Sequence, residues 1–453
     1  MLELCAFNIG VIFCYGIVID TGMFVKKLKN KLTILTYECK SPSTEIGICV
    51  LGGIMTESSK CIEYYHLLEH VLNGFPSDKA APMPDDYKIT SGAEVSNYIT
   101  HAFLKTVSRE PQAYTTMLDT IVSCLEQFRI SEQQLSTIKN DIVEEIKQET
   151  QTPFYKHRKR IDSIFTPFHS MCAGHKSRIE SVSDVTLDGV TQFVQHALTP
   201  DRIVLYFAGN KDDFGLINNY KSRLQTIQQQ SPVFSVSRLN NYTVKDARIG
   251  LYYTFEDSVS TTITCRWRLP ATRYDYGQKA VIDFIGDVMY NLLYTILKQE
   301  RLVTSIEVDT YYDDTNATLS HMDITCDCLT QSKSKDTILR IVNVLDQIHS
   351  SDEVLGTLFN NDTVKQYIID KIENQEEPQT TDESDTESIL PVHIVTNISQ
   401  VLWDRRVTTR KQLTKHDNGV RLDEVVQFFK QNIVCDNMYM FYSGPYKLFN
   451  QDA

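Results

Sequence analysis

The sequence predicts an α+β protein of two similar domains, each an antiparallel β-sheet covered by α-helices. Two observations support this fold class. The chain of 453 residues is long enough for two or three domains, and strand-like and helix-like stretches recur in the same order in its two halves. Ile46 of EIGICV aligns with Ile263 of TTITCRW, an offset close to half the chain. We therefore expect one domain at 25–220 and a similar one at 245–453.

The first domain is expected to open with two strands and a helix. The runs LTILTYE and EIGICVLGG flank the turn-rich KSPST and predict a hairpin. The stretch Ile62–Leu72 has apolar residues at helical spacing, and Gly74 with Pro76 marks its end. The alternating stretch TSGAEVSNYITHAFLKTV then predicts a strand, and a long helix is expected around 114–128.

A second long helix should follow, because Ser131 with Gln134 three residues later forms a capping box before EQQLSTIKNDIVEEIKQET. Its apolar residues are spaced three or four apart, as one helix face requires: Leu135, Ile138, Ile142 and Ile146. A helix near 187–197 and the strand RIVLYFAGN complete this half. The strands RIGLYYTFE and TTITCRWRL and a helix at about 277–300 then repeat the order.

Composition excludes several classes of protein. With 42% hydrophobic and 23% charged residues, the chain is typical of a packed globular protein. Its 11 cysteines include no CxxC pair, which argues against a disulfide framework and a cysteine zinc ribbon. A net charge of -13 gives little support to nucleic-acid binding, and we expect no membrane span. Seven of the acids lie at 373–387, which we predict to be a solvated loop insert in the second domain.

The strongest chemical signal is the pentapeptide HLLEH, from His66 to His70. On a helix, positions i and i+4 lie one turn apart on the same side, so both imidazoles can reach one tetrahedral Zn²⁺ with Glu69 beside them. This HxxEH order is typical of inverzincins, in which two histidines bind the metal and the free carboxylate takes a proton from water. The alternative is that both histidines cap or line a core helix.

A later helix offers the third protein ligand that catalytic zinc sites use. It carries four acids: Asp141, Glu144, Glu145 and Glu149. Glu145 borders the apolar face, since it follows Ile142 by three positions and precedes Ile146 by one. Glu144 lies nearer the solvent side and stays open as an alternative, and the outer two acids are expected at the surface.

These residues together resemble the pitrilysin/insulinase-type zinc metalloproteases, and within that family the beta-subunit type of mitochondrial processing peptidase is most similar. There a glutamate ligand on a later helix follows HxxEH, and here Glu145 lies 75 positions after His70 (145 minus 70). Three further segments match: the opening hairpin from LKNKLT to CVLGG, the Gly-rich strand SGAEVSNYIT, and the closing segment from IESVSDV to YFAGN.

The resemblance implies that 25–220 is a catalytic zinc-protease domain with one Zn²⁺ per chain. The zinc ligands would be His66, His70 and Glu145. Glu69 would be the general base that takes a proton from water and passes it to the leaving amine. Ala93 and Asn97 would hold the substrate chain against an edge strand, although a strand Asn with no ligand role is the alternative for Asn97.

The chain also departs from the family pattern. Tyr64 and Tyr65 stand before the first histidine, where the family has small residues, and Ile138 replaces a glutamate seven residues before the third ligand. In the second half, Leu292 and Ser305 stand where active members carry an Arg and a Tyr that help to hold substrate. We therefore expect a different outer support for the metal and a non-catalytic second domain.

The resemblance implies removal of N-terminal targeting presequences from proteins imported into a mitochondrion or a mitochondrion-related organelle. The expected partners are precursor proteins with basic presequences and either an alpha-type subunit or none, in the mitochondrial or mitosomal matrix. A noncatalytic core-type scaffold subunit of the same fold and a general peptide-degrading protease are the alternatives. A cytoplasmic location is the alternative to the matrix.

Overall fold

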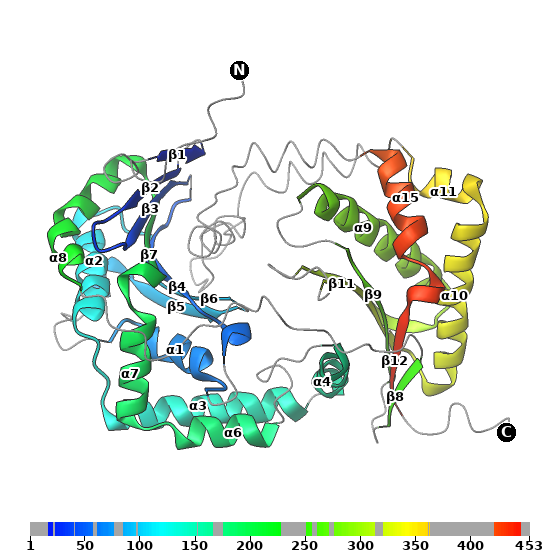
Figure 1. The fold of residues 1–453 in the computed structure, drawn as a ribbon, viewed down its shortest axis with the longest axis horizontal. Coiled ribbons are helices and arrows are strands. Elements are labelled where there is room, and N and C mark those ends of the chain that lie inside the picture. The colour runs from blue at the N-terminus through cyan, green and yellow to red at the C-terminus, as the bar shows by residue number, and fades with distance from the viewer. Residues whose placement is uncertain are drawn as a thin grey trace. The chain divides into compact units, whose positions relative to one another are not determined.

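The computed structural model describes residues 17–20, 23–39, 41–57, 61–76, 85–96, 98–151, 153–165, 175–227, 251–255, 261–270, 276–312, 320–360, 362 and 421–444. They form two compact units, each built on one β-sheet with its own helices (Figure 1). The first unit contains the described residues up to Ile146 and those at 175–227, and the second contains the others.

The first unit has a seven-stranded sheet in the order β1-β2-β3-β7-β4-β6-β5. Its strands are β1 (Ile17–Asp20), β2 (Met23–Lys27), β3 (Thr33–Glu38), β4 (Thr44–Leu51), β5 (Thr90–Val95), β6 (Ile99–Thr106) and β7 (Ile203–Gly209). Strand β4 shows the expected period of two: Ile46, Ile48 and Val50 lie in the main core, and Cys49 lies in a smaller cluster. One face of the sheet therefore carries the main core.

Helices of the first unit build the rest of that core. They are α1 (Tyr64–Leu72), α2 (Pro111–Glu126), α3 (Glu132–Gln151), α6 (His175–Asp184), α7 (Leu187–Ala197) and α8 (Lys221–Thr226). Helix α1 packs against β5, β6 and α7, and α2 packs against β4 and α8. On α3 the buried positions are Leu135, Ile142 and Ile146, three of the four apolar residues that the spacing selected.

One predicted strand proves to be a hairpin. The stretch from Thr90 to Val107 forms β5 and β6, which pair antiparallel, because the chain turns after Ser96. The backbone N–H of Ser96 donates to the carbonyl of Ile99, and the Ser96 hydroxyl accepts from the N–H of Ile99. The turn leaves β5 as the last strand of the sheet order.

The second unit has a five-stranded sheet in the order β10-β11-β9-β12-β8. Its strands are β8 (Leu251–Phe255), β9 (Thr261–Arg268), β10 (Val303–Tyr311), β11 (His321–Cys328) and β12 (Tyr439–Gly444). The helices are α4 (Pro153–Phe165), α9 (Tyr276–Gln299), α10 (Ser334–Ser350), α11 (Asp352–Leu358) and α15 (Leu422–Asn432). A separate apolar core joins this sheet to α9, α10, α11 and α15.

The two sheets share one topology. When the strands of each sheet are numbered along the chain from β3 and from β8, both orders read 1-5-2-4-3. Ile46 of β4 faces Leu104 and Phe207 on its neighbours, and Ile263 of β9 faces Cys326 and Tyr442 at the same places. The alignment of Ile46 with Ile263 therefore matches equivalent strands, and the predicted fold of two similar α+β domains is confirmed.

The predicted antiparallel pairing needs one refinement. Each sheet contains one parallel pair, β3 with β7 and β12 with β8. In the first unit the last strand, β7, lies between β3 and β4, and in the second unit the last strand, β12, lies between β8 and β9. A parallel neighbour needs a long crossover, and the helices between the first and last strands supply it.

Helix α4 belongs by packing to the second unit, although it lies within the first half of the sequence. Its Ile161 and Phe165 form a small core with Tyr439 and Phe441 of β12, and the His157 side chain lies 2.9 Å from the Thr264 hydroxyl. The domain limits 25–220 and 245–453 stay predictions, and the predicted acidic insert at 373–387 lies outside the described residues.

Among the described residues, Gly277–Gln299 of α9 is the one stretch long and apolar enough to cross a membrane by length and composition alone. Half of its most apolar window is buried inside the second unit. Leu293 and Leu297 of this helix are fully enclosed in the core. About half of the apolar stretch of α9 therefore packs in the core of the second unit.

Candidate metal centre

Helix α1 carries the HxxEH residues. Leu67, Leu68, Val71 and Leu72 are buried in the main core, which leaves His66, Glu69 and His70 half-buried on the other side of the helix. The helix begins at Tyr64 rather than at Ile62, because Glu63 adopts a left-handed conformation with φ 68°. The i, i+4 spacing of the two histidines is therefore realised on one helix face.

The start of α1 is held by a carboxylate from the preceding loop. The two oxygens of Glu57 accept hydrogen bonds from the backbone N–H groups of Glu63 and Tyr65, at 3.0 and 2.9 Å. The first N–H groups of a helix have no partner within it. Glu57 thus gives these two N–H groups the hydrogen-bond acceptors that the helix itself does not supply, and it fixes where α1 begins.

Tyr65, one of the residues that depart from the family pattern, is accommodated by Gly52. Its ring lies over this glycine, directly after β4, and edge-on to Phe193 with 5.1 Å between centroids. Arg202 donates a hydrogen bond of 2.8 Å to its hydroxyl. Gly52 has φ +144°, and a Cβ atom there would lie 2.2 Å from the ring. The large side chain in α1 therefore depends on glycine at position 52.

We expect Gly52→Ala to lower the free energy of unfolding by about 2–4 kcal/mol, because overpacking and the positive φ each add a cost. Chemical denaturation at equilibrium measures it. Gly215→Ala is the matched control, since Gly215 is exposed and a Cβ atom there meets nothing within 4 Å. It should change stability by no more than about 0.5 kcal/mol. Equal stabilities for the two variants would contradict this account of Tyr65.

The structure brings His66, His70 and Glu145 together. One ligand atom from each lies within 4.8 Å of the other two, and this is the only such set of three among the residues that the structure describes. Glu145 Oε2 lies 3.2 Å from His66 Nε2 and 3.4 Å from His70 Nε2. Helix α3 therefore presents Glu145, and not Glu144, to the two histidines.

The electrostatics differ between the two histidines. Burial alone would lower the pKa of His66, but the hydrogen bond and the charge of Glu63 outweigh it and raise that pKa. Burial lowers the pKa of His70, although Glu145 opposes the shift. Glu63 itself has its pKa lowered to about 2, because bonds to His66 and Arg178 outweigh the effect of its burial.

Glu69 has the properties of a proton acceptor near neutral pH. Burial raises its pKa to about 7, and the nearby carboxylates Glu145 and Glu94 add to the shift while His66 opposes it. A general base works best when its pKa lies near the working pH. The arrangement thus combines two nitrogen atoms and one carboxylate oxygen that could bind a metal with a separate carboxylate, Glu69, that can exchange a proton.

The predicted substrate-binding residues are described only in part. Ala93 lies in β5, the last strand of the sheet order, and α1 packs against this strand. Asn97 lies outside the described residues. Of the departures from the family pattern, Ile138 packs against the main core and Leu292 against the second core. The Ser305 hydroxyl donates to Asp327 at 2.8 Å.

The sequence interpretation missed Glu63 and Arg178. Glu63 Oε2 lies 2.8 Å from His66 Nδ1, and Arg178 of α6 donates to both oxygens of Glu63. A carboxylate three residues before a predicted metal-binding histidine was the available signal, since this spacing brings side chains together near a helix. Arg178 lies 115 residues away in sequence and has no comparable local signal.

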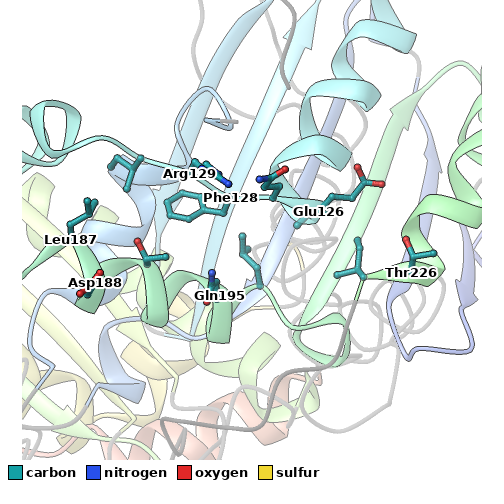
Figure 2. Close-up of a pocket in the computed structure, with 13 residues that line it drawn as sticks. Glu126, Phe128, Arg129, Leu187, Asp188, Gln195 and Thr226 are labelled. Carbon is teal, nitrogen blue, oxygen red and sulfur yellow. The ribbon is translucent and has the colours of Figure 1, made fainter. Parts of the chain in front are cut away.

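A pocket of about 840 Å³ is lined by a different set of residues (Figure 2). It is lined by the segment from Leu125 to Ile130, by α7 residues such as Asp188 and Gln195, and by Thr226 at the end of α8. None of the predicted site residues lines it. The candidate centre is therefore defined by its ligand atoms and not by this pocket.

Comparison with known proteins finds similar folds among solved structures. No protein-family model and no curated protein matches the chain. Among solved structures, it is similar to a protease from Helicobacter pylori (14% identity, TM-score 0.70, covering 93% of this chain and 99% of that one). It is also similar to an inactive M16 peptidase domain from Pseudomonas fluorescens (11%, 0.73, 94% and 98%). It is similar to pitrilysin as well, with 14% identity and a TM-score of 0.65, and the match covers 95% of this chain and 45% of pitrilysin.

These likenesses show the fold alone, because the identities are low. The chain has the two-domain fold of M16, or pitrilysin-like, peptidases. One of the matched structures is described as inactive, so the fold is compatible both with a protease and with a noncatalytic relative. The choice between them depends on the residues of the site.

Proposed function

We propose that this chain is a zinc metalloendopeptidase with its active site in the first unit. The observation that carries the proposal is the convergence of His66, His70 and Glu145, with Oε2 of the glutamate 3.2 and 3.4 Å from the two Nε2 atoms. A protein that kept this fold only as a scaffold would have no need of three converging ligand atoms. Glu69, on the same side of α1, supplies the acid–base group.

The donor set fits zinc. Two imidazole nitrogens and one carboxylate form a His₂Glu set, which catalytic zinc sites use with a further position left for water or substrate. A bound zinc ion would lower the pKa of water and polarise the substrate carbonyl. The remaining steps fall to the chain's own residues, so the site needs a base and a surface that orients the peptide.

Glu69 provides the base. With its pKa raised to about 7 by burial, it is ionised in a large fraction of molecules at neutral pH and can take a proton from water. The resulting carboxylic acid can then give that proton to the leaving amine. Strand β5, with Ala93, offers an edge along which an extended substrate can pair, and we assign Asn97 to the same role.

We further propose that the substrates are basic N-terminal presequences of proteins imported into a mitochondrion-related organelle, and that the chain acts in its matrix. The family resemblance supports this proposal, and the net charge of -13 is compatible with cationic substrates. The chain would act with an alpha-type subunit or alone. A protease that degrades free peptides is the alternative within the same chemistry.

A noncatalytic scaffold is the second candidate function. One observation favours it: Leu292 and Ser305 stand where the resemblance expects an Arg and a Tyr that hold substrate. Leu292 packs against the second core, and the Ser305 hydroxyl donates a hydrogen bond to Asp327. The assembled His66, His70 and Glu145 argue against it.

Metal analysis with a pair of peptides tests these functions. We expect about one zinc ion per chain and cleavage of an Arg-containing presequence peptide. A matched peptide with each Arg replaced by Gln should be cleaved more slowly. Equal cleavage of the two peptides would support the peptide-degrading alternative. Wild-type protein that neither binds zinc nor cleaves either peptide would show that the chain is a scaffold.

A further inference from the structure

The two ring nitrogens of His66 face different partners. Nε2 points to the candidate metal centre, where Glu145 Oε2 lies 3.2 Å away. Nδ1 points to Glu63 Oε2 at 2.8 Å. An ionised carboxylate can only accept hydrogen bonds, so the nitrogen that faces Glu63 must carry the hydrogen. Glu145 attracts a hydrogen to Nε2 in the same way, and a bound metal ion would take the place of that hydrogen and bind the Nε2 lone pair.

Glu63 is itself held from several sides. Arg178 of α6 donates from Nε to Oε1 at 2.5 Å and from Nη2 to Oε2 at 3.3 Å. Both residues are buried, with 8% of each exposed. The backbone N–H of Glu63 is bound by Glu57, and Ser181 of α6 donates to the carbonyl of Ile62 at 2.6 Å. Helix α6 therefore fixes both the backbone and the carboxylate next to His66.

Helix α3 gives no equivalent support at Ile138, the position where the resemblance expects a glutamate. The Ile138 side chain packs against the main core. An acceptor for the outer nitrogen of His66 comes instead from Glu63, which directly precedes α1 and has a left-handed backbone. The chain thus supports its first histidine through a local contact and one buried arginine.

We propose that Glu63, clamped by Arg178, is the positioning residue that fixes His66 with Nδ1 protonated and Nε2 presented to the zinc ion. The inference rests on the proposed zinc site and deepens it. Outer partners of ligating histidines fix the ring and raise its basicity, and their loss typically weakens metal binding or activity by about 10–100-fold. Arg178 acts through Glu63, so it is a positioning residue as well.

The test compares zinc affinity by chelator competition in wild type and in Glu63→Gln. A Gln side chain can turn its NH₂ group toward Nδ1, which favours the wrong tautomer of His66. We expect zinc to bind about 10–100-fold more weakly, and we expect the visible absorption bands of the Co²⁺-loaded protein to shift. Glu180→Gln is the matched control on α6, where Glu180 forms an exposed pair with Lys176, and its zinc affinity should equal that of wild type.

Glu63→Gln removes the negative charge that faces the buried guanidinium of Arg178, so the double variant Glu63→Gln/Arg178→Gln separates folding from positioning. Its metal-free thermal unfolding should return toward that of wild type, while its zinc affinity stays low. Wild-type zinc affinity and an unchanged Co²⁺ spectrum in either folded variant would overturn the inference and leave the proposed function standing. A wild-type protein that binds no zinc would overturn the proposed function and the inference with it.

Discussion

Glu69→Gln is expected to bind one zinc ion per chain and to hydrolyse peptides about 10²–10⁴-fold more slowly than wild type. The amide has the shape of the carboxylate but cannot take a proton from water. Glu69 is not among the three residues whose ligand atoms converge, so its replacement should leave metal binding intact. Zinc content and kcat/KM for the same peptide, measured on one preparation, check both halves of the prediction.

The pH profile sharpens this test. Glu69 must be ionised to act as a base, and its pKa of about 7 in the absence of metal can only fall when a dication binds nearby. In the wild type, kcat/KM should therefore fall as pH decreases, with an apparent pKa at or below about 7. Glu132→Gln, an exposed substitution at the start of α3, should keep the wild-type rate and profile. An unchanged rate in Glu69→Gln would remove Glu69 from the chemistry.

Glu145→Gln is expected to weaken zinc binding by more than about 100-fold, because loss of a direct ligand should exceed the loss of an outer partner. The neighbouring Glu144→Gln is the matched control and should bind zinc as wild type does. The two residues share one helix and one local sequence, but only Glu145 joins the histidines. Chelator competition on both variants gives the affinities.

Both changes on α3 should leave the fold intact. The Glu145 side chain is 53% exposed, and Glu144 is exposed as well, so the metal-free variants should unfold within about 0.5 kcal/mol of wild type. Loss of zinc in Glu144→Gln with normal binding in Glu145→Gln would mean that α3 presents its other acid to the histidines. That result would restore the alternative that the sequence left open.

Much of the site follows from local sequence because helix periodicity is a local property. The spacing of His66 and His70 determines that they share a face, and the apolar neighbours Leu67 and Leu68 determine that this face lies opposite the core. The order of strands and helices, which recurs about half a chain later, likewise predicts two similar domains. These inferences need no knowledge of which distant segments meet.

Distant contacts were decided only by the tertiary structure. Periodicity on α3 places Glu145 at the border of the apolar face and Glu144 nearer the solvent side, and only the packing of α3 shows that Glu145 lies 3.2 Å from His66. The parallel strands also escaped the sequence interpretation, because the returning strand of each unit pairs with a partner far away in the chain. For β3 and β7 the first paired residues are Thr33 and Val204.

The support of His66 shows the same division. The sequence alone established a helix with HxxEH, a later helix rich in carboxylates and the lack of a glutamate at Ile138. It did not reveal that Glu63 adopts a left-handed backbone or that Arg178, 115 residues away, binds its carboxylate. Local periodicity determines which side chains share a face, whereas burial between α1 and α6 determines which charges must pair, since a buried charge is stable only with a partner.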